Sequence, residues 1–172
     1  MDFDPCGGDD TAVSAELNVG LFDNERESNL ESTVAMVEEV LRELGHVVDQ
    51  SRVDSPNTER AWRVHKGSAE VAITIVEQDD FWHLRVAAAV MTIDNSVEIP
   101  ALYQRVLELN AHAVIGAAFG VKGPHVMLLS QRSTRDLDQS EVHDIIHRVQ
   151  EYADDWDDKL VDEFGGTLGA PD

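Results

Sequence analysis

Apolar residues along this chain recur with two periods, one of three to four residues and one of two. The first helical pattern covers residues 29–44, where Ser28 and Glu31 fit a capping box and Gly45 ends the pattern. Its apolar stripe consists of Leu30, Val34, Val37, Val40, Leu41 and Leu44. This spacing predicts a helix that buries one face. The apolar residues 47–48 then predict a short extended segment.

Strict alternation of apolar and polar or small residues follows in three segments separated by short turns. The segments are 62–65, 70–75 and 82–90, and the turns fall at 67–68 and 78–80. Segments of period two that are joined by turns this short predict an antiparallel meander with one buried face.

The stretch from Pro100 to Val121 predicts a helix, a tight turn and a strand built largely from small residues. Pro100 suits the first turn of a helix, where its missing N–H costs nothing. One helical face would carry Leu102, Tyr103, Val106, Leu107 and Asn110. One strand face would carry Val114, Gly116, Ala118 and Gly120, and the other Ile115, Ala117, Phe119 and Val121. A strand face this bare allows another backbone or helix to approach closely. The predicted dimer contact therefore consists of Leu102, Tyr103, Val106, Gly116, Ala118 and Gly120.

A further strand and a long helix complete the pattern. The turn at 123–124 leads into a strand over 125–129, and a helix begins at Asp138 or Ser140 and ends at 165–166. The apolar stripe of this helix consists of Val142, Ile145, Ile146, Val149, Ala153, Trp156 and Leu160. The predicted order is α-β-β-β-α-β-β-α, which is an α+β fold with an antiparallel sheet and flanking helices.

The first 28 residues differ from the rest of the chain in composition. They are acidic, rich in Gly and Asp, and lack a helical period, which predicts a flexible segment over 1–28. Within it, residues 13–21 alternate with period two, which predicts an edge strand or an arm that adds to a neighbouring sheet. The length of 172 residues predicts a single α+β domain over 29–166 and a C-terminal tail over 167–172.

Charge limits the classes of partner. The formal net charge is −21, and the 13 Lys and Arg residues form no cluster, which argues against nucleic acid and against an anionic membrane surface. The charge is either a solubilising coat, which a salt-adapted source would share, or a field that attracts basic partners. One cysteine, Cys6, and the lack of a long apolar run predict a soluble protein of the reducing cytoplasm.

Two histidines of the last helix are the strongest candidates for chemistry. His143 and His147 are four residues apart and could reach one metal ion, with Glu151 and Asp154 as possible oxygen donors. The side chain of Asp144 is too short to reach a metal-bound water as Glu does in zinc proteases. The sequence also shows no recognisable third metal ligand distant from this pair. We therefore predict no enzymatic activity and no metal or cofactor. The alternative is a metal-dependent hydrolase centred on His143 and His147.

The outer face of the predicted meander is the candidate binding surface. It would be formed by polar and small residues, namely Arg63, His65, Ala72, Thr74, Arg85 and Ala87. Small side chains leave room for those of a partner, and an extended peptide can add to a sheet edge. An ordinary solvated face has the same composition.

The order of elements resembles that of the type III secretion chaperones of the Tir-chaperone type and of the related YbjN-like proteins. The resemblance covers roughly residues 29–166, and the motifs that carry it are Gly67-Ser68-Ala69, Leu102-Tyr103, Leu107-Glu108-Leu109-Asn110 and Ala117-Ala118-Phe119-Gly120. It implies a small acidic α+β protein, often a homodimer, that binds extended segments of other proteins and catalyses nothing. We therefore predict a chaperone-like or regulatory protein-binding module.

Overall fold

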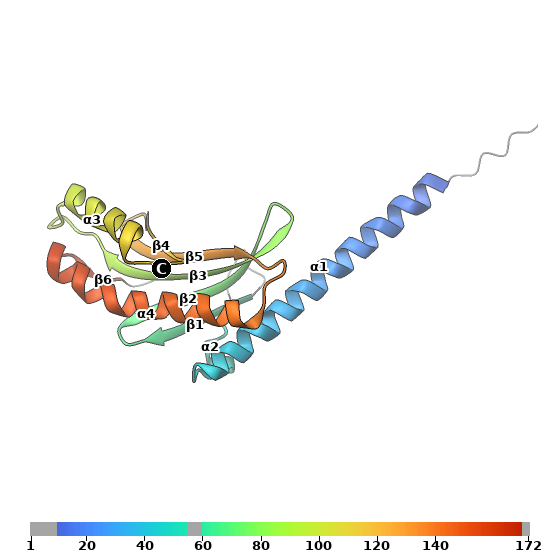
Figure 1. Cartoon of the computed structure of the whole chain (residues 1–172), viewed down its shortest axis with the longest axis horizontal. Helices are drawn as coiled ribbons and strands as arrows, with labels where there is room; N and C mark the ends of the chain where they lie inside the picture. Colours follow the sequence, from blue (N-terminus) through green and yellow to red (C-terminus); the bar gives the residue numbers. More distant parts are fainter. Residues whose placement is uncertain (1–9, 55–59, 170–172) are drawn as a thin grey trace, which may run out of the picture.

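A six-stranded antiparallel sheet forms the body of the protein, as seen in a computed structural model that describes residues 10–54 and 60–169 (Figure 1). The elements are α1 (Asp10–Glu43), α2 (Val48–Ser51), β1 (Arg60–Lys66), β2 (Ala69–Gln78), β3 (Phe81–Thr92), α3 (Ile99–His112), β4 (Ala118–Lys122), β5 (His125–Ser133), α4 (Gln139–Phe164) and β6 (Thr167–Leu168). The predicted α+β class, with its antiparallel sheet and flanking helices, is confirmed.

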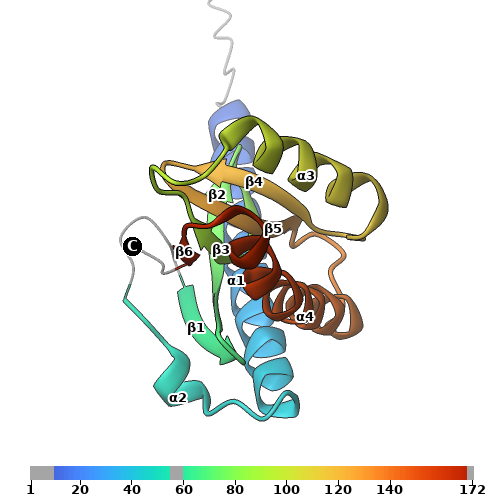
Figure 2. The ribbon, with the colours of Figure 1, turned by 90° about the vertical axis from the view of Figure 1, so that its left-hand side faces the viewer.

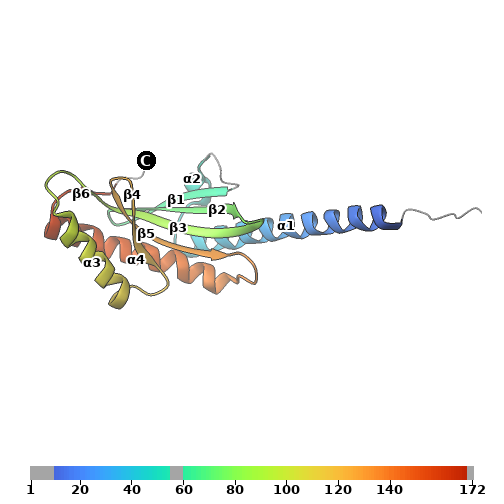
Figure 3. The ribbon, with the colours of Figure 1, turned by 90° about the horizontal axis from the view of Figure 1, so that it is seen from above.

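The strands lie in the order β1-β2-β3-β5-β4, and β6 pairs with β3 as well. The predicted meander is therefore β1-β2-β3, and α3 carries the chain across to the far edge, where β4 begins. Helix α4 runs along one face of the sheet, with α3 on the same side toward β4 (Figures 2 and 3). The buried face of the sheet consists of Trp62, Val64, Val71, Ile73, Ile75, Leu84, Val86, Ala88, Val126 and Leu128.

Helix α1 is longer than the sequence analysis predicts. Residues 13–21 are helical rather than extended, and Ser28 lies inside the helix instead of capping it. No proline occurs between Pro5 and Pro56, so nothing in this stretch interrupts a helix once it has formed. The predicted boundary after residue 28 therefore falls within α1. Side chains near its C-terminal end, including Val37 and Leu41, are fully buried beside α4.

Helix α2 replaces the extended segment that Val47 and Val48 predicted. Only Val47 keeps an extended backbone, with φ −87° and ψ 105°, and the single helical turn starts at Val48. The Ser51 hydroxyl donates to the Val47 carbonyl at 3.0 Å, and Val48 is buried while Val47 is exposed. A local hydrogen bond and the burial of one valine thus outweigh the β preference of the pair.

The predicted helix and bare strand are present as α3 and β4, but the strand is shorter than expected. Gly116 has φ +72°, so the backbone turns there and the strand starts only at Ala118. Asn110 of α3 donates to the Phe119 carbonyl at 3.1 Å and accepts from the Phe119 N–H at 2.7 Å. Its side chain therefore takes the position of a neighbouring strand at the edge of the sheet.

The capping of α4 agrees with the sequence. Asp138 is the N-cap residue: its carboxylate accepts from the Glu141 N–H at 2.9 Å, and the Glu141 carboxylate accepts from the Asp138 N–H at 3.2 Å. Such a reciprocal pair satisfies two backbone donors that a helix start leaves free. At the other end, Gly165 ends the helix.

The β1–β2 turn rests on α4 through a buried carboxylate. The Ser68 hydroxyl donates to Asp157 at 2.6 Å, and the other carboxylate oxygen of Asp157 accepts from the Asp158 N–H at 2.7 Å. Asp157 is only 2% exposed, so these hydrogen bonds compensate the burial of a charge. Gly67, with φ +53°, lies so close to Asp154 that an added Cβ would come within 1.7 Å of its carboxylate.

Replacing Ser68 with Ala removes one of the two hydrogen bonds to the buried Asp157. We expect the free energy of unfolding in urea to fall by about 1–3 kcal/mol, the usual cost of a buried polar group that loses its partner. Ser32→Ala, at an exposed position of α1, is the matched control and should change stability by less than about 0.5 kcal/mol. Equal stabilities for the two variants would contradict the assigned role of the Ser68 hydroxyl.

Candidate functional site

The sheet face opposite α4 brings together most of the residues predicted as a binding surface. Cross-strand pairing aligns Arg63, Ala72, Ala87, Leu129 and Ala118 in one row that crosses β1, β2, β3, β5 and β4. Ala72, Ala87 and Leu129 are half-buried, and Ala118 is exposed. The middle of this row is a shallow apolar strip, which we call the alanine row.

A polar row lies beside the alanine row. Thr74 pairs with Arg85, and Arg85 pairs with Gln131. Arg85 is half-buried, and no carboxylate in the described part of the chain forms an ion pair with it. The guanidinium of Arg85 therefore retains hydrogen-bond donors for a ligand on this face.

The two other basic residues predicted for this surface are already paired. The Arg63 Nε lies 2.8 Å from one carboxylate oxygen of Glu70, and the His65 Nε2 lies 3.2 Å from the other. These side chains border the alanine row at the β1 edge. Among the predicted surface residues, Arg85 alone combines a charge with the lack of an ion pair in the described residues.

The residues predicted for a dimer contact fall into two groups in the structure, one buried in the core and one at least partly exposed. Leu102 and Val106 are buried in the core of their own chain, which corrects their assignment to a contact between chains. The buried stripe of α3 is Leu102, Val106 and Leu109, so the helix is rotated relative to the predicted face. Tyr103, Ala118 and Gly116 are at least partly exposed, and Gly120 is half-buried.

The same region exposes large apolar side chains that the sequence analysis did not assign to a contact. Leu107 and Ile115 are 66% and 72% exposed, and Ile99 and Val121 are exposed as well, next to the predicted contact residue Tyr103. The alternation used in the prediction treats 114–121 as one strand, but the turn at Gly116 separates Ile115 from Phe119. Only Phe119 of the second predicted strand face is fully buried.

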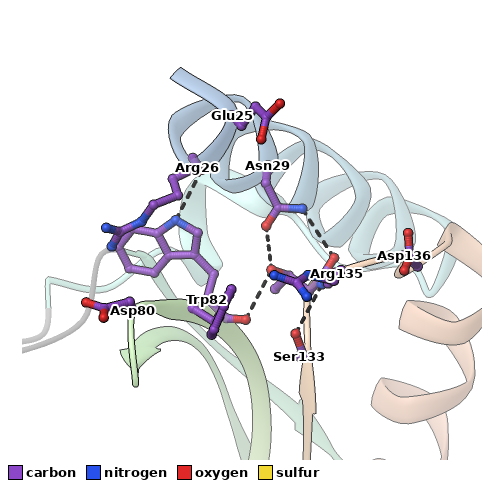
Figure 4. A pocket seen from close by; sticks show the side chains of 10 residues that line it. Glu25, Arg26, Asn29, Asp80, Trp82, Ser133, Arg135 and Asp136 are labelled. Carbon is purple, nitrogen blue, oxygen red and sulfur yellow. Dashed lines mark hydrogen bonds between the residues drawn. The ribbon is translucent and has the colours of Figure 1, made fainter. Parts of the chain in front are cut away.

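A cavity of about 500 Å³ lies where α1 leaves the sheet (Figure 4). The Trp82 Nε1 donates to the Arg26 carbonyl at 3.1 Å, and the Asn29 amide donates to the Thr134 carbonyl at 3.2 Å. The Thr134 hydroxyl also bonds to Asn29 and to the Trp82 carbonyl. These hydrogen bonds, in the wall of the cavity, attach α1 to β3 and to the segment that follows β5. We call this set of bonds the joint between α1 and the sheet.

Comparisons with known proteins agree on the class of this fold. Residues 31–172 match the family model described as T3SS (YopN, CesT) and YbjN peptide-binding chaperone 1. The chain belongs to this family. No curated protein matches the sequence.

Two solved structures contain a chain with a similar fold. A chain of the ExsC–ExsE complex superposes with a TM-score of 0.55 at 17% identity, covering 76% of this chaperone and 94% of that chain. A chain of the HopA1–SchA chaperone–effector complex gives a TM-score of 0.52 at 13% identity, covering 77% and 97%. At these identities the likeness shows the fold. The family match confirms the predicted protein-binding, chaperone-like class.

The histidine pair of this peptide-binding chaperone has no complete ligand set. The His143 and His147 rings stack with centroids 5.7 Å apart, but no group of three potential metal ligands occurs within residues 10–54 and 60–169. Glu151 pairs with Lys66 at 2.9 Å, and this hydrogen bond holds the pKa of Glu151 below its ordinary value. Asp144 pairs with Arg148 at 2.8 Å. Nothing in this arrangement or in the comparisons supports the hydrolase alternative.

No helix in the described part of the chaperone is both long enough and apolar enough to cross a membrane.

Replacing Asn29 with Ala should loosen the joint between α1 and the sheet. The change removes the side chain that bonds to the buried Thr134, so trypsin should cleave after Arg26 at least about threefold faster, as local opening costs less free energy. Asn24→Ala, at an exposed position of the same helix, is the control and should leave the cleavage rate unchanged. Equal cleavage rates for the two variants, followed by mass spectrometry of the fragments, would show that Asn29 does not hold α1.

Proposed function

We propose that this chaperone binds an extended segment of a client protein on the sheet face that carries the alanine row, and that it does so without catalysis. The observation that carries the proposal is a row of small residues across the sheet beside an arginine that has no ion pair in the described residues. The surface comprises Arg63, His65, Ala72, Thr74, Arg85 and Ala87, as predicted from the sequence.

The shape of the surface suits an extended chain. Ala72 and Ala87 face each other across β2 and β3, so that the side chains of a client find room between the taller residues on either side. Leu129 continues the apolar strip on β5. Alternate side chains of an extended client would point into this strip, and the others would remain in solvent.

The charge of the surface favours a particular client. Arg85 can donate to a carboxylate or to backbone carbonyls, and a charge-assisted hydrogen bond contributes about 1.5–3 kcal/mol. A client segment with an acidic residue among small or apolar ones therefore fits this face. One of the two similar structures is, by its own description, a chaperone–effector complex, which supports a protein as the client class.

The protein is further proposed to act as a homodimer in the cytoplasm, with neither nucleic acid nor a membrane as its partner. Ile99, Tyr103 and Leu107 recur every four residues on α3 and expose one apolar stripe. Ala118 and Gly120 of β4, which the sequence also predicted for the contact, belong to the opposite sheet face and are not part of this stripe. An apolar patch of this kind on a chain with a net charge of −21 is typical of a contact between proteins. The single Cys6 agrees with a reducing compartment.

Two negative charges on the alanine row should abolish client binding. In an Ala72→Glu, Ala87→Glu double variant, carboxylates fill the strip and would be buried beneath a bound segment, which we expect to reduce client recovery from the source cell at least about tenfold. Recovery is measured by quantitative mass spectrometry of the captured proteins. Ala35→Glu, at an exposed position of α1, is the control. Identical client recovery from the double variant and the wild type would contradict the assignment of this face.

A charge in the apolar stripe of α3 should separate the dimer. Leu107→Arg is expected to halve the mass measured by light scattering while circular dichroism shows a folded chain, because the site is 66% exposed and outside the core. Ala101→Arg is the control, since Ala101 is also exposed on α3 but lies away from the stripe. A dimer mass for both variants would exclude the stripe as the contact.

A further inference from the structure

The C-terminal strand β6 occupies a stretch of sheet edge that β2 leaves free. β2 pairs with β3 only up to Ala88, while β5 covers the opposite edge of β3 as far as Thr92. Into the gap beyond Ala88, β6 pairs Leu168 with Met91 and Thr167 with Thr92, and the Gly169 N–H donates to the Val90 carbonyl at 3.2 Å. β6 therefore continues the line of β2 along β3.

Glycine is required at two positions for this close approach. A Cβ added to Gly169 would lie 2.1 Å from the Ala89 carbonyl oxygen, and one added to Gly166 would lie 2.5 Å from the Thr92 carbonyl oxygen. Both neighbours are backbone atoms of a strand paired on its other edge, so they cannot move aside. A segment that follows the path of β6 along this edge thus needs glycine at two positions three residues apart.

Few contacts hold β6 on this edge. The strand has two residues, and both Thr167 and Leu168 are exposed, so little apolar surface is buried when it docks. It follows Gly165 and Gly166, both with positive φ, where the chain turns away from α4. Its attachment is mainly by backbone hydrogen bonds, which another segment with glycine at the same two positions can make as well.

We propose that the β3 edge over Ala89–Thr92 is a strand-acceptor site, and that β6 is a resident strand which an extended client segment of the pattern Gly-x-x-Gly displaces. The client rather than a second copy is the assigned occupant because the site continues the proposed binding face: Ala87 precedes Ala89 by two residues on the same strand. The inference rests on the proposed function, since it assigns part of the client to this edge. Displacement costs the chain little, and an incoming strand restores every bond that β6 gives up.

The test uses the full chain and a fluorescent peptide with the sequence of residues 164–172, so that it requires no client. In the wild type the resident strand competes at a millimolar effective concentration and keeps peptide binding weak. Gly169→Val drives the resident strand from the edge, and we expect it to bind the peptide at least about tenfold more tightly. Thr167→Val, with an exposed side chain and unchanged backbone, is the matched control and should behave as the wild type.

A peptide that itself carries Gly169→Val should not bind to any variant. Hydrogen exchange provides the second readout: amide protection in residues 89–92 should fall in the Gly169→Val chain and return when the unmodified peptide is added. Gly166→Ala, which places a Cβ against the Thr92 carbonyl, replaces Gly169→Val if that chain does not fold.

Three outcomes would overturn the proposal. These are equal peptide affinity of the variant and the wild type, equal binding of both peptides, and loss of the dimer in Gly169→Val, which would assign the edge to a second copy. Because the assay contains no client, a negative result does not bear on client binding at the alanine row. The Ala72→Glu, Ala87→Glu double variant tests that binding separately.

Discussion

The burial of one sheet face against α4 is the interaction on which the rest of the structure depends. Ile73, Leu84, Val86 and Leu128 are completely buried on that face, and each such side chain contributes about 1.5–3 kcal/mol on leaving water. Because the period of a strand is two, burial of these residues turns their neighbours to the opposite face. Ala72, Ala87 and Arg85 are such neighbours. The proposed binding surface is thus a consequence of packing the long helices on one side.

The backbone N–H and C=O groups at the edges of a sheet need hydrogen-bond partners even when only one face is covered. In this chain, one side chain and one short strand supply such partners. The Asn110 amide completes the backbone bonds of Phe119 on β4, and two residues of β6 cover β3 beyond the end of β2. A side-chain amide that is fixed in α3 is a permanent partner. We propose that a two-residue strand beyond a pair of glycines is an exchangeable one, because its attachment is mainly by backbone hydrogen bonds. The two edges of the same sheet therefore differ in how readily they admit a partner.

The sequence predicts those features of the fold that depend on local pattern. Period two in 70–75 and 82–90 predicts the meander, and Asp138 with Gly165 marks the ends of α4. The errors occur where a local pattern has two solutions. Residues 13–21 fit a strand by alternation, yet the chain continues as a helix through them. The rotation of α3, which buries Leu109 and exposes Leu107, depends on where β4 lies beneath it. The docking of β6 could not be predicted, because a two-residue strand is too short to show a period and its partner β3 is distant in the sequence.

The charge of this chain and the charge of its proposed binding face have opposite signs, and the two act over different distances. The net charge of −21 produces a field that repels acidic partners at long range, but salt screens such a field within about 8 Å at physiological ionic strength. When a segment lies directly on the surface, the charge nearest to it dominates the electrostatic interaction. Arg85 sits beside the alanine row without an ion pair in the described residues, whereas Arg63 is neutralised by Glu70. A client whose bound segment carries an acidic residue among small or apolar ones, with basic residues outside that segment, would satisfy both requirements: the basic residues would favour the encounter and the carboxylate would bind Arg85. On the proposed face, selectivity would then come from the position of one carboxylate along the segment rather than from its total charge.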